Sequence, residues 1–303
     1  MSFKIRWNWW RSRRLKHPPD DIHRAGDLAE MRLCKLSRAA GRDNGWHIFE
    51  SVRIPDPEGG RREIDMVVIG GNTMLVVEQK QWAGSFVITK EHHFVQHRKN
   101  RTKHNHDGVA DRIARKARIL KALHEKRLSL SEEDSIAMRV IVAMTHQHLE
   151  WPEIPDDLAA EMVDEAGFIQ ILESTSPGEM NEDLMETLSG FNTWDEVHLH
   201  GGLMLKGDVF SLGLGGQLRS WFAERKSPVG AITEHNRSLF SLFSNNPSEV
   251  TLNTGGKNIV AKIPYGMALE MHVVGEKKPR KIAWANITHI SVSKPPADWA
   301  KNV

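Results

Sequence analysis

The chain has 303 residues, of which 40% are hydrophobic, enough to build one large globular domain or two of ordinary size. Its net charge of +2 is unevenly distributed along the chain. Residues 1–130 contain 27 Lys and Arg and 15 Asp and Glu, residues 131–200 contain 1 and 17, and residues 201–303 contain 13 and 7. The excess of positive charge in the first part favours a polyanionic partner for it. The single Cys34 excludes an intramolecular disulfide and a cysteine-based zinc cluster, and without a long apolar run or a signal-peptide pattern we expect a cytoplasmic protein with no membrane partner.

Residues 1–19 are expected to form a basic, tryptophan-rich arm that ends at two prolines. Three indoles, Trp7, Trp9 and Trp10, are interleaved with basic side chains, namely Lys4, Arg6, Arg11, Arg13, Arg14 and Lys16. Such an arm can grip phosphates and stack on unpaired bases. A tail that docks on a membrane surface or a partner, and indoles folded onto the domain, are the alternatives.

The next segment predicts a helix followed by three strands. A stripe of apolar residues predicts a helix from Asp20 or Asp21 to Ala40, with Gly41 placed to stop it. Alternating residues predict strands over 46–54, 62–70 and 73–80. The pair Gly71-Asn72 suits a two-residue hairpin turn, and a further hairpin is expected beyond Gly84.

Residues 107–193 predict further helices around one buried strand. A basic helix is expected over 107–128, and the apolar run 136–144 is typical of a strand covered on both faces. In the acidic stretch that follows, short helices are expected at 156–163 and 180–188, with a strand at 168–172.

From about Trp194 the sequence changes to short strand-like runs broken by glycine, asparagine and proline. These runs predict a small β-rich domain, a barrel or sandwich, with one helix at 216–224. The expected domains are therefore the arm 1–19, an α/β domain 20–193 and a β-rich domain 194–303. The last would bind nucleic acid, a partner or a second copy, and its candidate contacts are Trp221, Arg237, Lys257, Lys262 and Lys281.

Two carboxylates are predicted to face each other across the hairpin. With Gly71 and Asn72 as the loop, paired positions sum to 143, which places Asp65 opposite Glu78. Side chains alternate along a strand, so Lys80 projects from the same face as Glu78. The alternative is a purely structural Asp65–Lys80 ion pair with Glu78 in solvent.

Facing carboxylates repel each other and need a cation between them. Their hard oxygens select Mg²⁺ or Mn²⁺ rather than zinc. Such a metal lowers the pKa of a bound water and offsets charge on a reacting phosphate, while Lys80 orients the hydroxide or neutralises a nonbridging oxygen.

At these residues the sequence resembles the nuclease-related domain (NERD) family of the PD-(D/E)xK nuclease superfamily. The matching segments are Gly-Asp-Leu-Ala-Glu at 26–30, Glu-Ile-Asp-Met-Val-Val at 63–68 and Val-Val-Glu-Gln-Lys-Gln-Trp-Ala-Gly at 76–84. The resemblance covers 22–130, and more loosely the chain to residue 190. It implies a mixed β-sheet flanked by helices.

The resemblance also implies roles for individual residues. Asp65 and Glu78 would be metal ligands, with the main-chain carbonyl of Gln79 as a further one. Lys80 would be the catalytic lysine and Glu30 a supporting acid.

Beyond the hairpin the sequence departs from the family pattern. The family shows Asn-Pro and a Gln at the head of the next helix, whereas this chain has Asn-His-Asp-Gly-Val at 105–109. His104 or His106 would then reach the phosphate or the leaving group instead. Trp82 and Gly84 are expected to shape the turn that leaves the site.

Histidines and cations gather between residues 92 and 115. A zinc site is one alternative for the histidines, which are His92, His93, His97, His104 and His106. Phosphate contact is the favoured interpretation of the wider set, which is Arg98, Lys99, Arg101, Lys103, His104, His106, Arg112 and Arg115.

The leading functional hypothesis is a Mg²⁺-dependent deoxyribonuclease, an endonuclease or nickase that hydrolyses DNA with a metal-activated water. The alternative is a non-catalytic nucleic-acid-binding module on the same fold, acting with a partner protein. A third is a scaffold whose acidic region 131–200 docks a basic protein. RNA is the alternative substrate, and the family suggests host defence or DNA repair.

Overall fold

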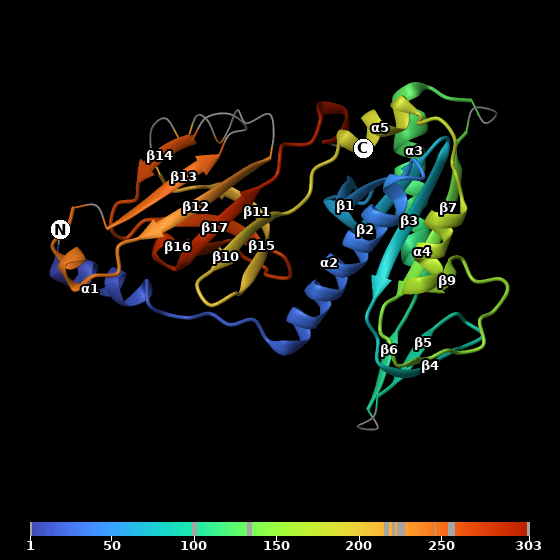
Figure 1. The fold of residues 1–303 in the computed structure, drawn as a ribbon, viewed down its shortest axis with the longest axis horizontal. Coiled ribbons are helices and arrows are strands. Elements are labelled where there is room, and N and C mark those ends of the chain that lie inside the picture. Colours follow the sequence, from blue (N-terminus) through green and yellow to red (C-terminus); the bar gives the residue numbers. More distant parts are fainter. Residues whose placement is uncertain are drawn as a thin grey trace. The chain divides into compact units, whose positions relative to one another are not determined.

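The computed structural model describes residues 2–98, 102–131, 135–214, 218–219, 222, 228–245, 247–253 and 258–301 (Figure 1). The chain folds as two compact units, one formed by Arg24–Asn192 with Pro296–Val303 and the other by Met1–His23 with Thr193–Pro295. The expected arm 1–19 is thus grouped with the β-rich part of the chain, and the last residues with the α/β part. Within the described ranges, no helix has the length and apolarity needed to cross a membrane.

A five-stranded mixed sheet is the centre of the α/β unit. Its order is β1-β2-β3-β7-β9, with antiparallel pairing from β1 to β3 and parallel pairing from β3 to β9. The strands are β1 (His47–Pro55), β2 (Arg61–Gly70), β3 (Thr73–Lys80), β7 (Ala137–Met144) and β9 (Glu161–Asp164). The predicted first hairpin and the buried strand are confirmed.

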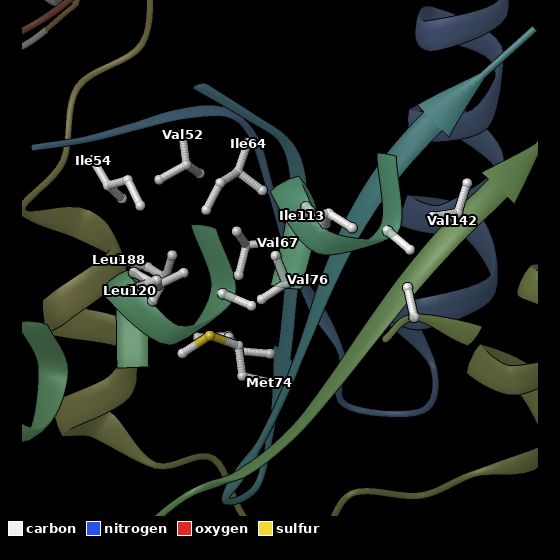
Figure 2. Close-up of a cluster of buried hydrophobic side chains, with 14 of the residues drawn as sticks. Val52, Ile54, Ile64, Val67, Met74, Val76, Ile113, Leu120, Val142 and Leu188 are labelled. Carbon is white, nitrogen blue, oxygen red and sulfur yellow. The ribbon is translucent and has the colours of Figure 1, made fainter. Parts of the chain in front are cut away.

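Helices cover both faces of this sheet because its central strands are apolar on both sides. On one face Met66, Val68 and Val77 pack against α2 (Asp21–Arg42) and α4 (Glu165–Ser174). On the other face Val67 and Val76 pack against α3 (Val109–Leu128) and α5 (Glu182–Ser189), as Figure 2 shows for Ile113, Leu120 and Leu188.

A smaller four-stranded sheet lies beyond Lys80. Its order is β6-β5-β4-β8, built from β4 (Gly84–Ile88), β5 (Phe94–His97), β6 (Lys103–His106) and β8 (Leu149–Glu150). Gly84 has φ +89°, and a Cβ there would lie 2.3 Å from the His97 carbonyl oxygen, so only glycine fits. Strand β6 was not predicted because the run Lys-His-Asn-His contains no apolar residue.

Three local predictions in this unit are wrong. Residues 156–163 contain no helix and lead into β9. Residues 168–172 lie in α4, which starts where the Asp164 carboxylate accepts a hydrogen bond from Gly167 N at 2.6 Å. Gly41 lies inside α2 and not beyond its end; a Cβ there would lie 2.9 Å from the Trp46 Cβ, so this glycine permits close packing.

The β-rich unit is one eight-stranded antiparallel sheet with the order β14-β13-β12-β17-β10-β11-β15-β16. Its strands are β10 (Asp195–Leu199), β11 (Met204–Ser211), β12 (Val229–His235), β13 (Ser248–Asn253), β14 (Asn258–Lys262), β15 (Ala268–Val273), β16 (Arg280–Ala283) and β17 (Ile287–Val292). A 3-10 turn, η3 (Trp284–Asn286), separates β16 from β17. The predicted helix 216–224 falls mostly outside the described residues.

Helix α1 (Phe3–Ser12) packs on this β-rich unit. Trp9 joins the core that contains the fully buried Trp284, whose indole donates to the Leu212 carbonyl at 2.6 Å. Arg13, 1% exposed, donates to Ser241 Oγ at 2.7 Å in the turn η2 (Leu239–Leu242). The segment 1–19 is therefore not a free arm, since the indoles of Trp9 and Trp10 and the Arg13 guanidinium are built into the fold.

Candidate active site

The β2–β3 hairpin has the register that the sequence predicts. Gly71 and Asn72 form the turn, and pairing runs from Gly70–Thr73 to Met66–Val77, so paired positions sum to 143. Gly71 has φ +51°, and a Cβ there would overlap the Pro177 carbonyl. The turn therefore requires a glycine, and the glycine fixes the register.

The two strands stop pairing with each other just where the charged residues begin. Pairing of β2 with β3 ends at Met66–Val77, although β2 pairs with β1 as far as Arg61 and β3 pairs with β7 as far as Lys80. Asp65 occupies the next position, where its carboxylate accepts a hydrogen bond from Gln79 N at 2.8 Å. A side chain thus replaces the main-chain partner that Gln79 N would otherwise have.

Glu78 lies between two lysines on the α3 side of the sheet. Its Oε1 accepts from Lys80 Nζ at 2.7 Å, and its Oε2 accepts from Lys116 Nζ, on α3, at 2.8 Å. All three side chains are largely buried, with exposed fractions of 14% for Glu78, 24% for Lys80 and 16% for Lys116. The alternative that left Glu78 in solvent is therefore wrong.

Burial and charge push the pKa values of the two carboxylates in opposite directions. Burial, together with the neighbouring charge of Glu78, raises the pKa of Asp65 to about 7, although Lys80, Gln79 N and Lys116 oppose the rise. Burial also acts to raise the pKa of Glu78, but the charges and hydrogen bonds of Lys80 and Lys116 outweigh it and lower that pKa. Adjacent acids with such divergent pKa values are typical of sites that handle protons or cations.

This donor set fits a hard divalent cation. Asp65 carries a charge that burial and Glu78 disfavour, which a bound cation would relieve. Mg²⁺ commonly takes only one or two protein carboxylates and keeps several waters. Across the residues that the structure describes, no group of three or more His, Cys, Asp or Glu side chains could hold a metal, so the histidines of 92–106 are not gathered as a zinc site requires.

One of the predicted phosphate contacts, His106, is affected by the charge of Lys80. His106 stacks on Trp82 with 4.1 Å between ring centroids and lies 3.1 Å from Gln96 Oε1. Burial lowers the pKa of His106, and the positive groups that add to this effect are His104, Arg98, Lys80 and Arg112. Three further predicted contacts, His104, Arg98 and Arg112, therefore share the electrostatic surroundings of His106 with Lys80.

The predicted contacts differ in their exposure and in their partners. Arg98, Lys103 and His104 are exposed, whereas Arg115 forms an ion pair with Glu58 at 2.7 Å. Lys99 and Arg101 lie outside the described residues. In the β-rich unit Arg237, Lys262 and Lys281 are described, whereas Trp221 and Lys257 lie outside the described residues.

Glu30 and the Gln79 side chain have partners other than Glu78 and its two lysines. Glu30 lies on α2, which covers the opposite face of the sheet from α3, and it adds to the rise of the Cys34 pKa that burial and Glu50 chiefly cause. The Gln79 side chain is buried, with Nε2 3.4 Å from Thr145 Oγ1. The supporting role of Glu30 and the ligand role of the Gln79 carbonyl stay predictions.

Lys116 is the site residue that the sequence did not single out. It follows Ile113 by three residues and directly precedes Ala117, both of which are buried. Residues three apart on a helix share a face, so Lys116 borders the stripe that packs on the sheet. A lysine at the border of the apolar stripe was the feature of the sequence that could have indicated its place in the site.

Comparison with known proteins identifies part of the chain. Residues 25–144 match the family model described as the nuclease-related domain, NERD. Among solved structures, the small subunit of the heterodimeric restriction endonuclease R.BspD6I is similar, with 11% identity and a TM-score of 0.26, covering 62% of this chain and 87% of that chain. No curated protein matches the chain.

Proposed function

Residues 25–144 form a nuclease-related domain, and from that premise we propose that this protein is a Mg²⁺-dependent nuclease that hydrolyses phosphodiester bonds of DNA as an endonuclease or nickase. The observation that carries the proposal is the pair Asp65 and Glu78, two half-buried acids whose pKa values diverge beside two lysines. The resemblance seen in the sequence rests on the same residues.

Asp65 and Glu78 would hold the cation, with the Gln79 carbonyl as a further ligand, and when bound it would supply an activated water and neutralise phosphate charge. Lys80 is placed to orient that water or to stabilise a nonbridging oxygen. Lys116 brings a second positive charge to the Glu78 carboxylate, to which Lys80 also donates. The two lysines also keep Glu78 ionised, which a metal ligand requires.

DNA is the proposed substrate because the domain presents cations around the site. Arg112 and the loop residue Arg98 are exposed, and both add to the positive surroundings of His106. Clustered cations bind a phosphate backbone by releasing its counterions. These side chains would hold the strand while the buried carboxylates act on one phosphodiester.

One observation favours a second candidate, a nucleic-acid-binding module that does not cut. Both oxygens of Glu78 accept hydrogen bonds from lysines, so a metal would have to compete with at least one of them. Such a module predicts salt-dependent DNA binding that survives Glu78→Ala, without metal-dependent cleavage.

Cleavage of supercoiled plasmid tests the proposal. The wild type should nick DNA with Mg²⁺ and stop when EDTA is added, and Asp65→Ala should lower the rate at least about 100-fold because the buried acid is lost. Asp43→Ala is the matched control, since Asp43 is an exposed acid of the same unit and its loss should leave the rate unchanged. Equal product from the wild type and Asp65→Ala would contradict catalysis at this site, and parallel assays with RNA decide the substrate.

A further inference from the structure

The β-rich unit presents large apolar side chains to solvent on α1 and η2. We call them the α1–η2 surface: Phe3, Ile5 and Trp7 of α1, Leu239 and Phe240 of η2, and Phe243 directly after η2. Phe240 is 85% exposed and Phe243 72% exposed. Isolated exposed apolar residues are ordinary, but a group of six on two adjoining elements indicates an interaction site.

Hydrogen bonds beneath this surface hold it in shape. Trp10 Nε1 donates to Ser238 O at 3.2 Å, and the buried Arg13 guanidinium donates to Ser241 Oγ and to Pro247 O at 3.5 Å. The Tyr265 hydroxyl lies 2.6 Å from Ser241 O and 2.7 Å from Ser244 O. These hydrogen bonds hold η2 in place, so the exposed phenylalanines project from a fixed main chain.

The segments that form the surface carry positive charge, although the exposed Glu234 and Glu249 lie just outside the second segment. Segments 1–19 and 236–248 contain no Asp or Glu, and their basic residues are Lys4, Arg6, Arg11, Arg13, Arg14, Lys16 and Arg237. Of these, only Arg13 is buried. A second copy docked on the same face would bring like charges together, so the complementary partner is anionic.

The aromatic rings of α1 are poorly placed to stack on bases. Phe3 stacks on Trp7 with centroids 6.3 Å apart, and Trp7 stacks on Trp10 at 5.4 Å. Arg14 covers the Trp10 ring at 3.9 Å. Each of these rings turns a face to a neighbour in the row, which leaves less ring area for bases, and Ile5 and Leu239 have no ring at all.

We propose that the α1–η2 surface binds the surface of an anionic phospholipid bilayer. Phe240, Phe243 and Leu239 enter the boundary between headgroups and acyl chains, while the basic side chains contact lipid phosphates and carboxylates. The binding is peripheral and uses only side chains of one unit. It does not depend on the proposed nuclease activity.

Sedimentation of the full-length protein with vesicles tests this proposal. The wild type should bind vesicles of phosphatidylcholine with phosphatidylserine, bind phosphatidylcholine alone weakly, and lose binding as salt rises. The double variant Phe240→Ser with Phe243→Ser should bind about tenfold or more weakly, because two large apolar side chains no longer leave water. Ile232→Ser with Val274→Ser is the matched control, since both residues are exposed apolar positions of the same unit outside this surface.

Four outcomes would overturn the proposal. These are no binding of the wild type to anionic vesicles, equal binding to neutral vesicles, or equal loss of binding in the two double variants. The fourth is single-stranded oligonucleotide binding, or self-association in sedimentation velocity, that is lost in the phenylalanine variant without any vesicle binding. Retained plasmid cleavage by the phenylalanine variant would show that the two proposals stand separately.

Discussion

Two aspartates, the buried Asp195 of the β-rich unit and the half-buried Asp65 of the α/β unit, show how differently a fold treats a carboxylate. Asp195, at the start of β10, has both oxygens engaged by main-chain groups: Val209 N donates to Oδ2 and Ser293 N to Oδ1, each at 2.7 Å. Asp65, in β2, accepts from Gln79 N at 2.8 Å and has Glu78 as a like-charged neighbour. Asp195 ties segments of its unit together, whereas Asp65 stays short of compensation.

The contrast separates structure from chemistry in physical terms. Fixed N–H dipoles stabilise a buried carboxylate at no cost when nothing else must bind it. A carboxylate that faces another acid loses stability, and a bound cation restores it. The incompletely compensated charge of the Asp65 carboxylate is therefore what we expect of a metal ligand. Substitutions at the two aspartates test whether they differ in this way.

The largest expected effect on stability belongs to Asp195. Asp195→Asn replaces an oxygen that accepts a main-chain N–H with an amide that donates, so we expect the free energy of unfolding to fall by about 3 kcal/mol. Urea denaturation followed by circular dichroism measures it. Asp208→Asn, an exposed neighbour on β11, should change stability by less than about 0.5 kcal/mol. A similarly small change at Asp195 would remove its structural role.

Asp65 should behave in the opposite way. Its folded pKa, about 7, lies above the unfolded value of about 3.9. The folded state therefore holds the proton more tightly, and the stability that this gives at low pH is lost as pH rises through 7. Asparagine can still accept from Gln79 N but carries no charge. Asp65→Asn should therefore raise the free energy of unfolding by about 2 kcal/mol at about pH 8 without Mg²⁺.

The same denaturation experiment, repeated in acid and with metal, sharpens this result. The advantage of Asp65→Asn should shrink toward about pH 4, where the wild-type acid is protonated in both states. Mg²⁺ should stabilise the wild type and leave Asp65→Asn unchanged, because a ligand stabilises only a state that binds it. Destabilisation by Asp65→Asn at about pH 8 would show that Asp65 is structural, like Asp195.

The sequence predicted the hairpin well because its determinants are local. Gly71 and Asn72 fix a two-residue turn, the turn fixes the register, and alternation assigns Lys80 to the face of Glu78. The buried strand β7 and the helix α3 also follow from short-range patterns. Local rules sufficed where neighbours in sequence are neighbours in space.

Other features depended on contacts that local patterns do not encode. The five residues 168–172 are apolar enough for a strand or a buried helix, and the Asp164 cap decides for the helix. The main-chain N–H groups that compensate Asp195 come from residues 14 and 98 positions away. Lys116 meets Glu78 across 38 residues of sequence, so only the packing of α3 on the sheet brings them together.

Substitution of Lys116 should have the smallest effect, and it distinguishes a role in catalysis from a role in packing. Lys116→Met removes a positive charge that lowers the pKa of both Glu78 and Asp65, so both pKa values should rise. The acidic limb of the pH–rate profile, which the higher pKa of Asp65 sets, should then move to higher pH. We expect about a tenfold loss of cleavage rate, less than for Lys80→Met, since removing one of two charges costs less than removing the group at the reacting phosphate. Lys116→Arg should recover most of the rate, and Arg118→Met, an exposed cation on the same helix, should leave both rate and profile unchanged. An unshifted profile in Lys116→Met would mean that the charge of Lys116 does not tune the two carboxylates, and this lysine would then serve packing of α3 rather than the chemistry.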